Sequence, residues 1–175
     1  DTLNIDTENP TATVDLGATS LSDSSISTTS TITFSEVPTG FDAGTDLTVT
    51  GGVLGTGSFD VSNKIWTATY TANDGITGVG SVLLASGSYT DAEGNDGSGD
   101  SDTLNIDTEN PTATVDLAAT SLSDSSISTA LTITFSEVPT GFDAGADLTV
   151  TGGALGTGSF DGTGLIWTAT YTADD

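Results

Sequence analysis

The chain has 175 residues and carries 25 acidic side chains against a single basic one, Lys64, so its formal net charge is -24. Such a polyanion repels nucleic acids and anionic membrane surfaces and attracts cations. The chain has no Cys and no His, which excludes a disulfide framework and leaves oxygen atoms as the available metal ligands.

From the N-terminus, short apolar runs alternate with Thr and Ser, and Gly, Asn and Asp separate them. This period of two predicts β-strands rather than disorder. The expected strands, A to G in chain order, are residues 11–16, 27–34, 46–50, a weak strand at 55–59, 65–71, 81–89 and 103–107. Seven short strands in one repeat indicate an all-β fold, a two-sheet immunoglobulin-like sandwich. The side chains expected inside are Val14, Leu16, Ile32, Phe34, Leu47, Val49, Trp66, Tyr70, Val82 and Leu84.

A long repeat sets the domain organisation. The sequence DTLNIDTENPTATVDL begins at Asp1 and again at Asp102, and residues 102–175 repeat residues 1–74 with ten mismatches. A period of 101 residues matches a whole domain rather than a solenoid repeat. We therefore expect tandem, head-to-tail modules. Residues 1–6 would be the last strand of a preceding repeat, 7–107 a complete Ig-like repeat, and 108–175 a second repeat without its last two strands. The native protein is expected to continue at both ends, unless another segment completes the second repeat.

Strand direction alternates through such a sandwich, so loops B–C, D–E and F–G should gather beside the linker that enters the module. Acidic and amide side chains of the linker, the B–C segment and the F–G loop then converge at that end: Asp6, Glu8, Asn9, Glu36, Asp42, Asp46, Asp91, Glu93, Asn95, Asp96 and Asp100. The opposite end offers Asp23, Asn73 and Asp74, facing the next linker with Asp107, Glu109 and Asn110.

These carboxylates would repel one another strongly without a counter-ion. Oxygen ligands without His or Cys select Ca²⁺ rather than zinc or copper. The competing interpretation is that they are solvated turn residues, since Asp, Asn and Gly fill turns in any case. The near absence of basic partners favours calcium, and we expect one ion to join Asp74, the following linker and Glu137. The F–G sequence D-x-E-x-N-D-G superficially matches an EF-hand loop, but it is too short and lacks the closing Glu and flanking helices.

The runs IDTENPTATV, TITFSE, DLTVTGG, WTATY and SYTDAEGN, in this order, resemble the bacterial Ig-like repeats of giant calcium-dependent, repeats-in-toxin-type adhesins. The linker is also similar to the cadherin interdomain segment, where Asp and Asn before a Pro hold calcium. The resemblance covers essentially the whole repeat. It implies rod-like extender modules on a secreted or bacterial cell-surface protein. It supports the following calcium ligands: Asp6, Glu8, Asn9, Asp107, Glu109, Asn110, Asp91, Glu93, Asn95, Glu36 and Glu137. Asp42, Asp46 and Asp74 are left open by it.

Two functions remain open. The first is a structural spacer whose only partners are neighbouring repeats, with no nucleic acid, no direct membrane contact, and any glycan or surface ligand bound elsewhere in the parent protein. The second is a glycan-, surface- or ice-binding module that uses exposed loops or a threonine face. An enzyme is not expected, because no cleft is indicated for paired carboxylates and Lys64 is Leu165 in the other copy. Trp66 and Tyr70 could stack a glycan, although a Trp in a sandwich more often packs in the core.

Overall fold

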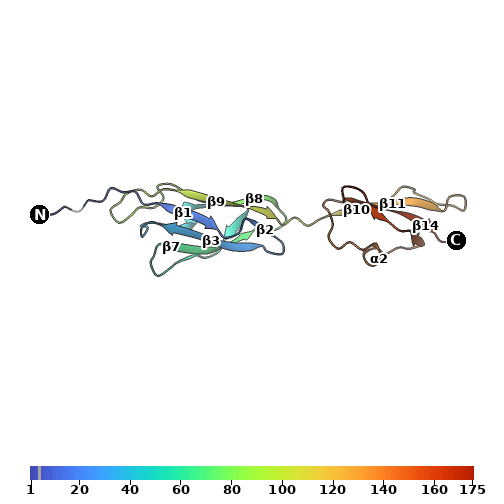
Figure 1. Ribbon diagram of the computed structural model, residues 1–175, viewed down its shortest axis with the longest axis horizontal. Helices are drawn as coiled ribbons and strands as arrows, with labels where there is room; N and C mark the ends of the chain where they lie inside the picture. Colours follow the sequence, from blue (N-terminus) through green and yellow to red (C-terminus); the bar gives the residue numbers. More distant parts are fainter. Residues whose placement is uncertain (4) are drawn as a thin grey trace. The chain divides into compact units, whose positions relative to one another are not determined.

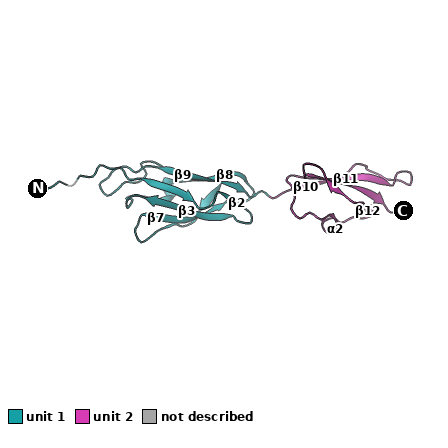
Figure 2. Ribbon diagram, in the orientation of Figure 1, with its two compact units in different colours: residues 1–109 teal, residues 110–175 magenta. Residues whose placement is uncertain are grey.

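The structure is a computed structural model and describes residues 1–3 and 5–175. It divides into two compact units, unit 1 (Asp1–Glu109) and unit 2 (Asn110–Asp175), which Figure 2 shows in different colours. Residues 1–3 and 5–11 form no strand. The assignment of residues 1–6 to a preceding repeat stays a prediction, and Asn4 lies outside the described residues.

Unit 1 is a sandwich of two β-sheets (Figure 1). The first sheet contains β1 (Ala12–Leu16), β3 (Ser27–Phe34), β5 (Gly52–Leu54), β6 (Ser58–Phe59) and β7 (Ile65–Ala72). The second contains β2 (Ser20–Ser22), β4 (Leu47–Thr50), β8 (Thr77–Leu84) and β9 (Asp100–Asp107), and the short helix α1 (Ala43–Asp46) precedes β4. The strand orders are β1-β3-β7-β5, with β6 also on β7, and β2-β9-β8-β4. All neighbours are antiparallel except β2 and β9, which are parallel.

The expected strands A, B, C and E correspond closely to β1, β3, β4 and β7, and the sandwich prediction is confirmed. The weak fourth strand is instead two short ones, β5 and β6. The prediction for the sixth strand, residues 81–89, is wrong at both ends. It begins at Thr77, because β8 pairs with β9 as far as Asp107, and it ends at Leu84, because the following residues turn into the F–G loop. The seventh strand, predicted from residue 103, begins three residues earlier at Asp100.

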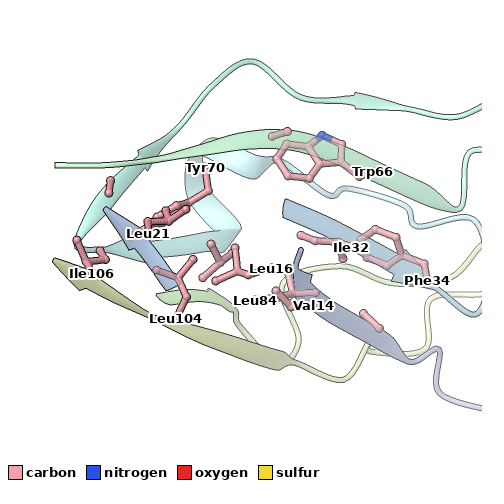
Figure 3. Close-up of a cluster of buried hydrophobic side chains, with 14 of the residues drawn as sticks. Val14, Leu16, Leu21, Ile32, Phe34, Trp66, Tyr70, Leu84, Leu104 and Ile106 are labelled. Atoms are coloured by element: carbon pink, nitrogen blue, oxygen red, sulfur yellow. The ribbon is translucent and has the colours of Figure 1, made fainter. Parts of the chain in front are cut away.

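Apolar side chains from both sheets form the core of unit 1 (Figure 3). Of the ten side chains predicted to point inward, eight are buried, and only Leu47 and Val49 are partly buried. Leu21, Leu104 and Ile106 join this core from β2 and β9. The strands alternate between buried and exposed residues because one face of each sheet packs on the other sheet.

Unit 2 repeats the first sheet alone. It contains β10 (Ala113–Leu117), β11 (Ser128–Phe135), α2 (Ala144–Asp147), β12 (Gly153–Leu155), β13 (Ser159–Phe160) and β14 (Ile166–Ala173). The order β10-β11-β14-β12, with β13 on β14, is the order of the first sheet in unit 1. A smaller core remains, formed by Leu131, Ile133, Trp167 and Ala169.

Candidate metal centre

The F–G loop of unit 1 is organised around the carboxylate of Asp91, which is only 1% exposed. Its Oδ1 accepts a hydrogen bond from the backbone N–H of Asn95 (2.8 Å), and its Oδ2 accepts one from the Asn95 side-chain amide (2.7 Å). The backbone N–H of Asp91 in turn donates to the Asn95 carbonyl (3.2 Å). Asp91 is therefore fixed in place, and the loop does not depend on an ion to hold this side chain.

Tyr89 anchors the same loop to the linker that enters the module. Its ring is buried against Phe34, with 5.0 Å between ring centroids, and its hydroxyl donates to the carbonyl of Ser98 (3.1 Å) and lies 3.4 Å from that of Pro10. The backbone N–H of Ser98 also donates to the Pro10 carbonyl (2.9 Å). Gly97 is required here, because a Cβ at that position would overlap the Tyr89 ring. The loop and the linker therefore share one buried anchor.

The linker brings a second carboxylate to the loop. Oxygen atoms of Asp6, Asp91 and Glu93 lie within 4.8 Å of one another, and Asp6 and Glu93 are exposed to solvent. The Asn95 amide also approaches the backbone carbonyl of Asp6 (3.4 Å). Three carboxylates thus lie close together at the end of unit 1 where the chain enters.

The protonation of Asp91 fits a cation site. Burial raises its pKa, but the hydrogen bonds from the Asn95 side chain and from the backbone of Asn95, Gly94 and Glu93 outweigh burial and leave the pKa below the ordinary value of 3.8. The carboxylate is therefore charged near neutral pH. The group consists of hard oxygen donors only, which suits calcium and not a soft metal.

The other predicted ligands at this end have different positions. The B–C segment does reach the F–G loop, because Thr39 and Thr90 exchange backbone hydrogen bonds of 2.7 and 3.0 Å. The carboxylates of Glu8 and Glu36 nevertheless lie outside the group of three. Asp42 caps α1 by accepting from the backbone N–H of Gly44 (2.8 Å), which is a structural role. A role for Glu8, Asn9 or Glu36 in binding calcium stays a prediction.

At the opposite end of unit 1, Thr108 fastens the outgoing linker to the turn between β7 and β8. Its side chain is fully buried, and its hydroxyl donates to the carbonyl of Asn73 (2.7 Å) and accepts from the backbone N–H of Ile76 (3.1 Å). Backbone bonds join Thr108 N–H to the Ile76 carbonyl (2.8 Å) and Gly75 N–H to the Thr108 carbonyl (3.0 Å). The outgoing chain is therefore held to unit 1 as far as Thr108.

Two predicted ligands share a partner beside Thr108. The hydroxyl of Thr77 lies 3.2 Å from a carboxylate oxygen of Asp107 and 3.4 Å from one of Glu109. Asp74 lies in the adjacent turn. The proposed ion between Asp74, this linker and Glu137 would connect the two units, and it stays a prediction, as does a role for Asn110.

Several important residues were missed or misjudged from the sequence. Tyr89 was expected in a strand, although the small Gly97 was an available signal of its role. Thr108 was not considered, although its position shortly before the linker Pro was a signal. Trp66 (5% exposed) and Tyr70 (fully buried) belong to the core, so they offer no platform for a glycan. The outward-facing residues of β3 and β7 include paired threonines, such as the exposed Thr29 with Thr69 and the half-buried Thr31 with Thr67, as strand alternation predicts.

The sandwich of unit 1 and the sequence repeat define a chain of tandem immunoglobulin-like modules. The chain belongs to the bacterial Ig-like domain family, whose model matches residues 6–108 and again residues 107–175. This confirms the resemblance to bacterial Ig-like repeats. A comparison with curated proteins finds no match. Within the described residues, no helix is long and apolar enough to cross a membrane.

Solved structures with a similar fold include invasin, described as a bacterial integrin-binding protein, at 15% identity and a TM-score of 0.44 over 94% of this chain. The adhesin InvE of Yersinia pseudotuberculosis follows at 15% identity and 0.40 over 93%, and InvD of the same organism at 18% and 0.35 over 93%. The chain spans 34%, 51% and 49% of the lengths of these structures, respectively.

Proposed function

We propose that these modules are structural spacers of a bacterial cell-surface adhesin and that calcium stiffens the joints between them. Bacterial Ig-like domains are a family that is not usually enzymatic, and their tandem repetition suits a part that supplies length. The strongly negative charge disfavours nucleic acids and anionic membranes as partners. The partners we propose are the neighbouring repeats, and the location is the bacterial surface or the medium.

The observation that carries the proposal is the convergence of Asp6 with Asp91 and Glu93. Asp6 belongs to the linker, whereas the other two belong to the F–G loop, so an ion held by all three would tie the linker to the module. Calcium accepts six to eight oxygen ligands, including backbone carbonyls and amide oxygens. The Asp6 carbonyl and water could complete the shell. When bound, calcium would supply positive charge that offsets the repulsion among the carboxylates.

The length of the joint also supports stiffness. Thr108 is bonded to unit 1, and Pro10 is bonded to the F–G loop at the other end of that module. Pro111 is the repeat equivalent of Pro10. If a complete second module holds Pro111 as unit 1 holds Pro10, only Glu109 and Asn110 remain unanchored, and both carry oxygen ligands. A joint of two residues has little freedom to bend, and a bound ion would remove much of the rest.

Calorimetric titration with calcium tests the site directly. We expect binding to unit 1 with a dissociation constant in the range of about 10⁻⁴–10⁻³ M, typical of extracellular modules, and weak substitution by magnesium. The double variant Asp6→Asn/Glu93→Gln should weaken binding strongly, because it removes two of the three charges. Asp96→Asn, in the same loop but outside the group, is the matched control. If the double variant and the control bind calcium with equal affinity, the carboxylates of Asp6 and Glu93 are only part of a solvated surface.

A further inference from the structure

The first and last strand segments of unit 1 run side by side in the same direction. Val14 contacts Asp100 and Leu16 contacts Asp102 through hydrogen bonds, and Ser20 to Ser22 then pair in parallel with Asn105 to Asp107. The sequence separation between partners is 86 residues in the first part and 85 in the second. The first strand segment therefore has one more residue between the two parts than the last segment has. We call these contacts of residues 14–22 with residues 100–107 the terminal seam.

The first half of the terminal seam is made by side chains. β1 lies at the edge of its sheet and pairs only with β3. The backbone N–H groups of Val14 and Leu16 donate to the carboxylates of Asp100 and Asp102, each at 2.8 Å. Hydrogen bonds to charged acceptors are stronger than neutral ones. The DSD run of residues 100–102 therefore links the two sheets, whereas Asp100 was expected among the calcium loop acids.

The second half of the seam is made by the backbone. The N–H of Asn105 donates to the carbonyl of Thr19 (2.9 Å), and β2 continues the parallel pairing to Asp107. Leu21 (3% exposed) and Ile106 (2%) pack in the core below these bonds. This half is thus protected from water on its inner side.

The direction of the seam determines how it responds to tension. The chain enters unit 1 at one end and leaves it at the other (Figure 1). Tension on the N-terminal side pulls β1 and β2 toward the entry, and tension on the C-terminal side pulls β9 toward the exit. Because the two segments are parallel, this slides one along the other and loads all the bonds together. In an antiparallel pair loaded from one end, the bonds would break one after another.

We propose that the terminal seam is the tension-bearing contact of the module, with Asp100 and Asp102 as its first two bonds. This rests on the proposed spacer function, since only a spacer between a cell and a surface carries tension along its length. It does not depend on calcium. The alternative role for the two carboxylates is to cover the free edge of β1 against pairing with other chains. That role requires no resistance to force.

Force spectroscopy of the full chain held by its two ends, in chelator, tests the proposal. The readout is the unfolding rate of unit 1 at constant force. The test variant is Asp100→Ala/Asp102→Ala. The matched control is Asp15→Ala/Asp23→Ala, which removes the same charge from exposed residues of β1 and the turn after β2. Leu54→Ala, in β5 of the first sheet and packed against the core, controls for loss of stability away from the seam, which a thermal melt measures in parallel.

The seam predicts about tenfold faster unfolding under force for each lost bond, hence about 100-fold for the double variant. The charge control should unfold at the original rate, and Leu54→Ala should lose melting temperature with a smaller change in rate. The proposal is overturned if the test variant matches the charge control. It is also overturned if Leu54→Ala accelerates forced unfolding as much at an equal loss of melting temperature.

If the double variant shows no folded unit 1, Asp102→Asn decides the question, because it keeps an oxygen acceptor and removes only the charge. An increase of about threefold or more in the forced unfolding rate supports the seam, and a smaller change overturns it. Repeating the measurement in calcium separates the two proposals. If the seam variant unfolds faster under force but calcium does not change the rate, only the calcium proposal is contradicted. If calcium changes the rate but the seam variant does not, only the seam proposal is contradicted.

Discussion

Unit 1 and unit 2 share nearly the same sequence over the first 74 residues of the repeat, but they differ greatly in burial. Val14 is 7% exposed and its equivalent Val115 is 63% exposed, while Leu16 is 5% and Leu117 is 43% exposed. The strand pairing is the same in both units. The first sheet is thus specified by its own sequence, whereas the core on its inner face requires the second sheet. In unit 2 a cavity of about 240 Å³ lies on this face, lined by Val115, Leu117, Leu131 and Tyr171 among others.

The largest expected effect tests what the two units share. Trp66 and Trp167 are 5% and 6% exposed, and each packs edge-on against a Phe ring, at 5.7 and 5.6 Å between centroids. Trp66→Ala and Trp167→Ala should each lower the free energy of unfolding of their own unit by about 3–5 kcal/mol. Denaturant unfolding of the full chain measures both. An unchanged unit 1 in Trp66→Ala would mean that this side chain is not a core residue.

The next effect tests what separates the units. Leu16→Ala should cost unit 1 about 2–5 kcal/mol, because that side chain is buried between the sheets. Leu117→Ala should change unit 2 by less than about 1 kcal/mol, because the side chain is already largely in water. The same denaturant titration compares them. Equal losses at the two positions would contradict the open inner face of unit 2.

A smaller effect is expected at a mismatch between the copies. Ser30 is fully buried, and its hydroxyl has no hydrogen-bond partner among the described residues, whereas the second copy has Leu131 at the equivalent position. Removing an unpaired buried hydroxyl, so that only the methyl group of Ala remains, removes a desolvation penalty, and Ser30→Ala should therefore stabilise unit 1 by about 1 kcal/mol. Thr29→Ala, exposed and already Ala130 in unit 2, is the control and should have no effect. A destabilised Ser30→Ala would show that the hydroxyl has a partner in solution.

The smallest effect concerns acid. Hydrogen bonds from the hydroxyls of Ser62 and Thr163, together with backbone N–H groups, lower the pKa of Asp60 and Asp161 below 3.8 in the turn before β7 or β14. A carboxyl whose pKa is depressed in the folded state contributes stability above its unfolded pKa, and this is lost as pH falls through the folded value. Both units should therefore weaken below about pH 4. Asp60→Asn should reduce this dependence in unit 1 alone, as thermal melts from pH 7 to pH 3 would show.

The sequence predicted the strands and most of the core because alternation and the 101-residue repeat are strong signals. It predicted that acids converge near the entering linker, and Asp6, Asp91 and Glu93 do lie together. It could not separate these from Asp42 or Asp100, because an Asp in a cap, in a strand and in a metal site looks the same in a sequence. The four mismatches at residues 61–64 indicated a tolerant turn. Within this turn both copies keep a hydroxyl, at Ser62 and at Thr163. In the structure each hydroxyl donates a hydrogen bond to the carboxylate of the Asp two residues earlier.

The central claim, that calcium stiffens the joint, is tested most directly by small-angle scattering. The sample is a chain in which residues 75–107 are repeated after Asp175, so that both repeats are complete. Calcium at millimolar concentration should increase the maximum dimension relative to chelator, because Asp107 and Glu109 would then be tied to both modules. The variant Asp107→Asn/Glu109→Gln should abolish the increase, and Asp116→Asn/Asp124→Asn should retain it. The same maximum dimension with calcium and with chelator would contradict the account.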